Sequence, residues 1–376
     1  MAARRDGNRG NRGGAAAPRS RRGMTAMPAA AVGRGVLTLL AGVGGALLAG
    51  WWRLPLPWFT GPLLTLAAAN MAGARLPSLP HARDGGQWII GIALGLYFTP
   101  QVTREILRLA PWLLLNIGFV MALGLLGAWL LRRLSGESVT TCYFAAPIGG
   151  ASEMATQAER HGGRVDRVAA AHSLRIMMVA LIVPFTLQWL GVRGADPYAP
   201  VSATLDPAGL AVLGAVAAAG AVVLARLGVP NHWMLGPLLV TAALTAQGFM
   251  LSALPGSVIN VGQLLIGIAL GTRFEPEFFR AAPRYLAAVA LVTVVYLALS
   301  ALFGWWLALM AALAIPTAVV ATTPGGIGEM AITAKVLQLG APIVSAFHAI
   351  RMAAVVLTVG LLFRLARPLL AAKDRP

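Results

Sequence analysis

Long apolar runs recur along the whole chain, and short segments rich in Pro, Gly and Arg separate them. A helix needs roughly 20 apolar residues to cross a bilayer. Only 11% of the residues are charged, whereas soluble domains carry roughly 25%. The backbone has to satisfy its own hydrogen bonds in lipid, and the runs lack the two-residue alternation of a barrel strand. The sequence therefore predicts an all-α membrane protein with about 10 to 12 transmembrane helices.

The second half of the chain repeats the first at a spacing that stays nearly constant. The motif Gly-Ile-Ala-Leu-Gly occurs twice, and so do Glu-Met-Ala and His-x-x-Arg. Their positions are 91–95 and 267–271, 153–155 and 329–331, and 172–175 and 348–351. Chance does not keep one spacing across such rare residue types, so we predict two homologous membrane repeats.

We place these repeats at residues 34–194 and 205–366, between an Arg-rich leader (1–33) and a basic tail (367–376). Seven arginines lie between Met1 and Gly23, and we expect this leader to be disordered. Basic ends predict that both termini lie on the cytoplasmic side of an inner (plasma) membrane, close to anionic lipid. The sequence contains no folded nucleic-acid-binding domain beside these basic ends, so we expect no direct contact with nucleic acid. Five spans per repeat imply inverted repeats and six imply parallel ones, and both schemes stay open.

Each repeat contains one apolar segment that is interrupted by a helix breaker and paired glycines and followed by a carboxylate. The breaking residues are Pro147, Gly149 and Gly150 in the first repeat and Pro324, Gly325 and Gly326 in the second. Proline removes a backbone donor and glycine weakens a helix, so we expect a broken helix in each repeat. Glu153 and Glu329 then lie in the first turn of the second half-helix, where the helix dipole stabilises a carboxylate.

A His-x-x-Arg pair follows each glutamate: His172 with Arg175, and His348 with Arg351. Residues three apart share a helix face, and ionisable residues inside apolar runs usually mark a pathway, a relay or an internal ion pair. Our hypothesis is that Glu, His and Arg of both repeats surround one central substrate or proton site. Arg would bind or balance an anion, Glu would exchange a proton and His would titrate near neutral pH. The structural alternative is that two Glu–Arg pairs lock neighbouring helices without any transport role.

The glycines of each Gly-Ile-Ala-Leu-Gly motif are four residues apart, a spacing that predicts close helix packing. Gln87 and Gln263 precede these motifs and either hydrogen-bond between helices or line the site. Cys142 is the single cysteine, and the sequence contains no metal-binding or nucleotide-binding motif. We therefore expect neither a metal nor a cofactor.

The duplicated Pro-x-Gly-Gly…Glu-Met, Gly-Ile-Ala-Leu-Gly and His-x-x-Arg elements resemble the bacterial AbrB-type family of integral membrane proteins. The resemblance covers nearly all of residues 34–366. Labels used in that family imply either regulation of gene expression or an ammonia monooxygenase. A copper or iron monooxygenase needs several convergent His and carboxylate ligands, and here only His172 and His348 lie in apolar runs. We therefore do not expect an enzyme.

Three functions remain in competition. We expect a secondary transporter of a small solute, coupled to protons through a Glu/His/Arg site between the repeats. The alternative is a membrane regulator that influences gene expression through a soluble partner, and a monooxygenase comes last. Membrane lipid and an unknown small solute are the expected partners, and the sequence is compatible with a homo-oligomer.

Overall fold

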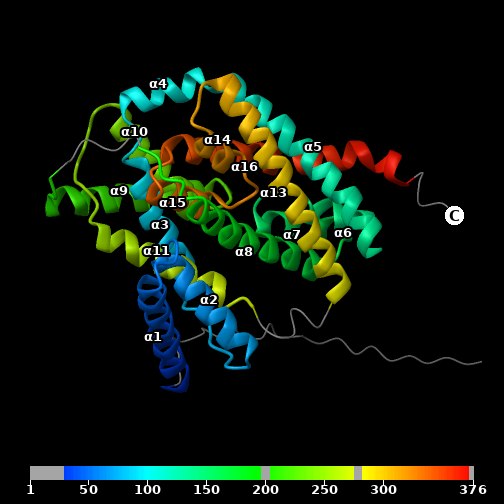
Figure 1. Ribbon diagram of the computed structural model, residues 1–376, viewed down its shortest axis with the longest axis horizontal. Helices are drawn as coiled ribbons and strands as arrows, with labels where there is room; N and C mark the ends of the chain where they lie inside the picture. The colour runs from blue at the N-terminus through cyan, green and yellow to red at the C-terminus, as the bar shows by residue number, and fades with distance from the viewer. Residues whose placement is uncertain (1–28, 196–203, 275–281, 372–376) are drawn as a thin grey trace, which may run out of the picture.

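The computed structural model describes residues 29–195, 204–274 and 282–371, and within these ranges it is helical and contains no strand (Figure 1). Six of the described helices are long and apolar enough to cross a membrane. They are α1 (Ala29–Trp51), α5 (Ala110–Ser135), α8 (Val165–Trp189), α9 (Pro207–Arg226), α13 (Pro283–Ala311) and α16 (Ala341–Ala371). The predicted all-α membrane fold is confirmed at this level. Helix α1 begins before, and α16 ends after, the predicted repeat boundaries.

Shorter helices occupy the remainder of the described chain. They are α2 (Pro57–Met71), α3 (Ala82–Gly95), α4 (Pro100–Arg108), α6 (Val139–Ala145), α7 (Ala151–Arg160), α10 (His232–Ala246), α11 (Gly256–Gly271), α14 (Ile315–Thr322) and α15 (Ile327–Val336). Both halves begin with a long helix, continue through short helices to a second long helix, and end with two short helices and a final long helix. Three short helices (α2, α3 and α4) separate the first two long helices of the first half, and two (α10 and α11) are described at that place in the second half. The duplication itself stays a prediction from the sequence. Most of the Arg-rich leader, for which we predicted disorder, lies outside the described residues.

The first broken helix is a hairpin rather than a single interrupted span. The backbone N–H of Arg164, just after α7, donates to Oγ1 of Thr141 in the first turn of α6, at 3.1 Å. The rings of Phe144 and His161 stack with their centroids 5.4 Å apart. The end of α7 therefore lies beside the start of α6, and the chain enters and returns at the same end. In the second half, α14 and α15 also contact each other, and both pack against α16. The pair α14–α15 is called the second hairpin, and the residues between its two helices are called its tip.

Glycines hold the short helices of the two halves against each other. A Cβ at Gly91 of α3 would lie 2.6 Å from the carbonyl oxygen of Met234, at the start of α10. A Cβ at Gly271 of α11 would lie 2.7 Å from the carbonyl oxygen of Leu63 in α2. No side chain fits at such distances, so α3 packs on α10 and α11 packs on α2 with their backbones in close contact. The predicted packing role of these glycines is confirmed.

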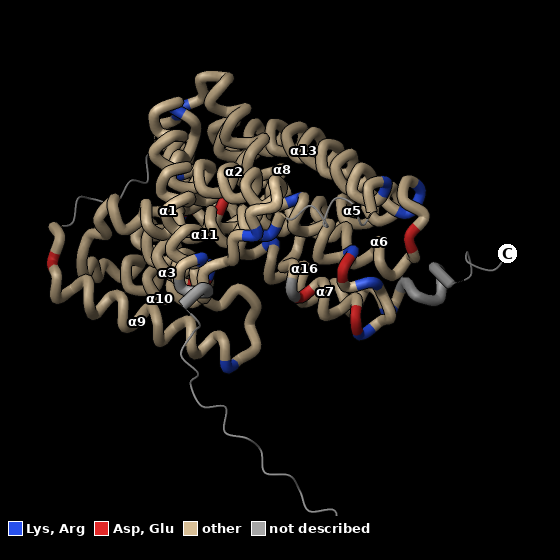
Figure 2. Tube along the Cα trace, turned by 90° about the horizontal axis from the view of Figure 1, so that it is seen from below, with Lys and Arg blue, Asp and Glu red and all other residues tan. Residues whose placement is uncertain are grey.

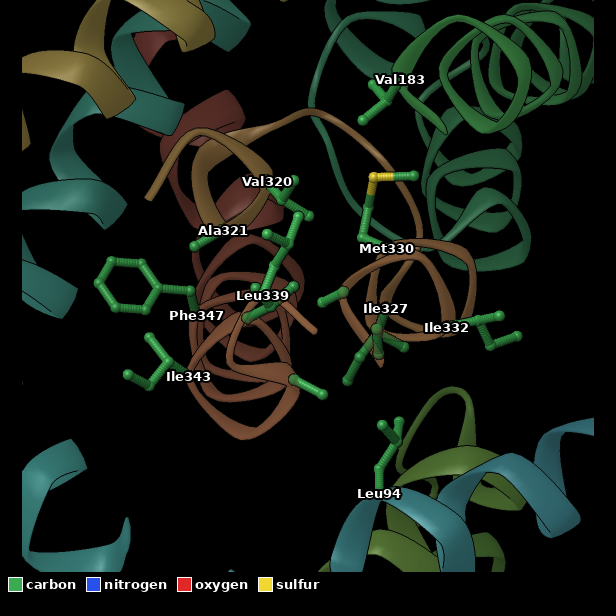
Figure 3. Close-up of a cluster of buried hydrophobic side chains, with 14 of the residues drawn as sticks. Leu94, Val183, Val320, Ala321, Ile327, Met330, Ile332, Leu339, Ile343 and Phe347 are labelled. Atoms are coloured by element: carbon green, nitrogen blue, oxygen red, sulfur yellow. The ribbon is translucent and has the colours of Figure 1, made fainter. Parts of the chain in front are cut away.

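The largest apolar core surrounds the second hairpin. Figure 3 shows side chains of α14, α15 and α16, including Val320, Met330 and Phe347, together with Leu94 of α3 and Val183 of α8. Charged residues are sparse over most of the molecule and gather around the α5–α6–α7 end (Figure 2). There Glu137 pairs with Arg167 at 3.2 Å and with Arg164 at 3.7 Å, so ion pairs hold the open end of the first hairpin.

Candidate functional site

Glu153 and Glu329 each follow the interruption between two short helices. The side chain of each folds back over the glycine that precedes its helix. Glu153 lies in the first turn of α7 and Glu329 in the first turn of α15, as predicted. Gly150 and Gly326 are the N-caps of these helices, and a Cβ on either would collide with the carboxylate of its glutamate. A carboxylate at this place is stabilised by the positive end of the helix dipole. The hydrogen of glycine leaves room for the folded-back carboxylate, which would have to move if a Cβ were present.

Both glutamates line one cavity of about 470 Å3 between the two halves. The tips of both hairpins contribute through Gly149, Gly150 and Gly326. The remaining walls come from α3, from Ala225 of α9, from residues 228–233 before and at the start of α10, and from single apolar residues of α8, α11 and α16. The tertiary structure thus brings together two segments that lie in opposite halves of the sequence.

Several polar residues of this cavity were not predicted from the sequence. Arg83 and Asp84 lie in the first turn of α3, and Asn231 and His232 lie at the start of α10. Arg83 and Asp84 directly precede a glycine-rich apolar run, and this pattern could have predicted that α3 contributes charged residues to a site. Nothing in the sequence distinguishes the α10 residues from ordinary loop residues, so only the tertiary contact reveals them.

His172 and Arg175 of α8 brace the tip of the first hairpin. Nη1 of Arg175 donates to the carbonyl oxygens of Ala145 and Ala146 at 3.1 and 3.0 Å, and Nη2 donates to that of Pro147 at 2.9 Å. Nη2 of Arg175 is also 2.7 Å from Nδ1 of His172, whose Nε2 is 3.1 Å from the carbonyl oxygen of Phe144. These are the carbonyls that the end of α6 leaves without helical partners. The pair therefore fixes the shape of the break.

Arg351 of α16 holds the second tip in the same way but with fewer contacts. It donates to the carbonyl oxygens of Thr323 at 2.7 Å and Gly325 at 2.6 Å. Within the described chain, Nε of Arg351 has no hydrogen-bond partner. The same holds for both ring nitrogens of His348, although the carbonyls of Ala321 and Val344 lie nearby. Arg351 is 3% exposed and His348 is 0% exposed, so these unpaired groups are fully enclosed.

The two His–Arg pairs meet in a small cavity of about 50 Å3 between the hairpin tips. It is lined by His172, Arg175, His348 and Arg351, and by Gly149, Pro324, Gly325 and Gly326 among the breaking residues. No ion pair joins either glutamate to Arg175 or Arg351 in the described residues. The structural alternative of two locking Glu–Arg pairs is therefore not what the geometry shows, because the arginines hold backbone carbonyls instead.

The two glutamines differ in position. Gln87 lines the large cavity, whereas Gln263 is 5% exposed and is not among the residues that line it. Pro147 contributes its carbonyl to Arg175 and lies against Gly124 of α5. The described residues contain no group of three or more His, Cys, Asp or Glu arranged to hold a metal ion.

Residues 65–367, which include both hairpins and both His–Arg pairs, match the family described as "Transition state regulatory protein AbrB". The chain belongs to the AbrB family. The resemblance predicted from the duplicated motifs is thereby confirmed.

Two relatives extend this AbrB-family match. "Putative regulator AbrB" of Escherichia coli (strain K12) is 27% identical over 330 residues, which cover 86% of this chain and 92% of that protein. "Uncharacterized protein YhjN" of Bacillus subtilis (strain 168) is 27% identical over 306 residues, covering 74% of this chain and 76% of that one. Six apolar helices and these matches fit a multi-pass membrane protein of the AbrB family.

Proposed function

We propose that this AbrB-family protein is a secondary carrier that couples the movement of a small solute to protons held by Glu153 and Glu329. The observation that carries the proposal is the single cavity lined by both glutamates and by the tips of both hairpins. Carriers often place substrate between two repeats, next to interrupted helices.

The size and the lining of the cavity suit a small solute. Ligand pockets usually measure about 300 to 1,000 Å3 and combine apolar walls with a few convergent polar groups. This cavity measures about 470 Å3, and Ile176, Ile266 and Met352 alternate with its polar residues. Freed backbone groups at the hairpin tips give further donors and acceptors, which membrane proteins tolerate where they line a cavity.

The two kinds of ionisable residue take different parts in this proposal. The glutamates line the cavity and bind or release protons there. The His–Arg pairs hold the hairpin tips, next to which the glutamates lie. Arg175 and Arg351 bond only to backbone oxygens and to His172 in the described contacts. Movement of a hairpin would therefore carry its glutamate as one unit with α8 or α16.

Proteoliposomes with a pH-sensitive dye inside test this proposal. Gradients of methanesulfonate, succinate, glycine, choline and glucose are imposed in turn, because these solutes cross lipid slowly. At least one solute should drive proton movement, and Glu153→Gln and Glu329→Gln should abolish it. Glu105→Gln is the matched control, since Glu105 lies on α4 and pairs with Arg108 at 3.3 Å outside the cavity. Proton flux that persists in both cavity variants would exclude the proposed role of the glutamates.

A second candidate is a membrane regulator that affects gene expression, which the names of the family and of the E. coli relative favour. In that case a soluble partner would bind the Arg-rich leader, part of which lies outside the described residues. Deleting residues 1–23 should then remove the effect on expression, whereas a carrier would keep its flux.

A further inference from the structure

Two arginines that were not predicted as site residues, Arg83 and Arg273, lie beside Glu329. Arg83 of α3 lines the large cavity, and it also lines a small adjoining space of about 20 Å3 together with Arg273, which follows α11, and Glu329. A space of this size holds about one water molecule. The three charged groups are therefore neighbours, and Arg273 lies within electrostatic range of both Arg83 and Glu329.

This pair of arginines is present on one side only. At the spacing that relates Glu153 to Glu329, Arg83 corresponds to Ile259 and Arg273 corresponds to Tyr97. Glu153 therefore has no such pair in the equivalent positions of the other half. The asymmetry places a second arginine next to Glu329, in the small space that adjoins the large cavity, and the otherwise duplicated framework does not require it.

The charged residues of the whole site carry one more positive than negative charge, which one bound anion would balance. The described residues that line the three adjoining cavities include four arginines and three carboxylates: Arg83, Arg175, Arg273 and Arg351, with Asp84, Glu153 and Glu329. The N-termini of α7 and α15 also face the large cavity, and helix N-termini favour anions. The enclosed and unpaired Nε of Arg351 adds a further donor behind the tips.

We infer that the transported solute is a small organic anion, whose carboxylate or sulfonate group is bound by Arg83 and Arg273 in competition with Glu329. The inference rests on the proposed carrier function and names the class of its solute. Without a bound solute, the carboxylate of Glu329 balances one of the two positive charges of Arg83 and Arg273. When a proton binds to that carboxylate, the arginines are free to bind the anion. Proton and anion therefore enter together, and the only bond that forms is the O–H bond of the protonated Glu329.

The other charged and titratable groups around Glu329 are compatible with this exchange. Asp84 lies on α3 beside Arg83, Glu153 lies on the opposite tip, and His232 lies at the start of α10. Arg175 and Arg351 lie behind the tips, where backbone carbonyls hold them. Because guanidinium groups bind planar carboxylates in a two-pronged manner, Arg83 and Arg273 fit such an anion better than lysines would.

Binding to the purified full-length protein tests the inference directly. The melting temperature is measured by tryptophan fluorescence in detergent with sodium methanesulfonate, sodium succinate or choline chloride, each against sodium chloride of equal ionic strength. An anion with a Kd of about 1 mM raises the melting temperature clearly when present at about 100 mM. At least one of the two organic anions should give this rise, more at pH 6 than at pH 8, and choline should not.

Variants assign the rise to the two arginines. Arg83→Gln and Arg273→Gln should weaken the apparent affinity by on the order of tenfold or more. Arg104→Gln is the matched control because Arg104 is an exposed arginine on α4. If a Gln variant does not fold, Arg83→Lys or Arg273→Lys replaces it. We then expect a partial loss of affinity for the anion, because lysine keeps the positive charge but lacks the two-pronged geometry of the guanidinium group.

The outcomes separate this inference from the carrier proposal. A rise with choline only, no rise with either organic anion, or a rise that survives in both arginine variants would overturn the anion site. Proton flux driven by choline but not by the anions would also overturn it and would leave the carrier proposal intact. Anion binding without any flux in proteoliposomes would overturn the carrier proposal and leave the anion site standing.

Discussion

Nη2 of Arg175 donates a hydrogen bond of 2.9 Å to the carbonyl oxygen of Pro147, at the tip of the first hairpin. The donor comes from α8 and the acceptor from a break that precedes that helix in the chain. A buried arginine therefore replaces the helical partners that the break removes. This contact links the helix that bears the His–Arg pair to the loop that positions Glu153.

Replacing Arg175 by Met should destabilise the protein and abolish proton flux together. The change keeps most of the side-chain volume but leaves the carbonyls of Ala145, Ala146 and Pro147 without their charged donor. We expect a loss of about 2 to 4 kcal/mol in the free energy of unfolding. Thermal unfolding in detergent measures it, with Arg104→Met on α4 as the control. Equal melting temperatures for the two variants would contradict the bracing role.

Replacing Gly326 by Ala should remove the flux that depends on Glu329 while the fold is retained. The new Cβ would collide with the carboxylate of Glu329, which then has to leave its place over the helix N-terminus. Gly328→Ala is the matched control, because its Cβ would meet only Cδ1 of Ile266, at 3.9 Å. Proton flux and thermal unfolding are measured for both variants. Normal flux in Gly326→Ala would show that the folded-back position is not needed.

The first hairpin should present both of its ends to the same side of the membrane. Single cysteines are introduced at Ser138, before α6, and at Val165, after α7, in a Cys142→Ser background. Both positions are exposed, and they flank the hydrogen bond between Arg164 and Thr141. A membrane-impermeant maleimide added to one side should label both or neither. Labelling of the two positions from opposite sides would mean that this segment crosses the membrane.

Part of the candidate site followed from local sequence alone. Pro147 with Gly149 and Gly150 predicts a break because these residues weaken a helix wherever they stand, and Glu153 then falls in the first turn of α7. The same reasoning holds for Gly326 and Glu329. Both predictions depend on backbone chemistry within a few residues, which the sequence carries in full.

The partners of Arg175 and the anion-binding pair could not be predicted in this way. One alternative drawn from the sequence paired Arg175 with a glutamate, because opposite charges attract, but its acceptors are carbonyls exposed by the break. Arg83 and Arg273 come from opposite halves of the chain and lie in unrelated motifs. Only the packing of α3 against α11 brings them to one side of Glu329.

The sequence by itself determined that the chain is helical, apolar and broken twice beside a carboxylate, because these properties depend on composition and on neighbouring residues. The tertiary structure decided that the first broken segment is a hairpin and that Glu153 and Glu329 share one cavity. It also decided that Arg83 and Arg273 lie beside Glu329, in a small space that adjoins that cavity. These features depend on contacts between segments far apart in the chain, and glycine packing between the two halves holds those segments in place.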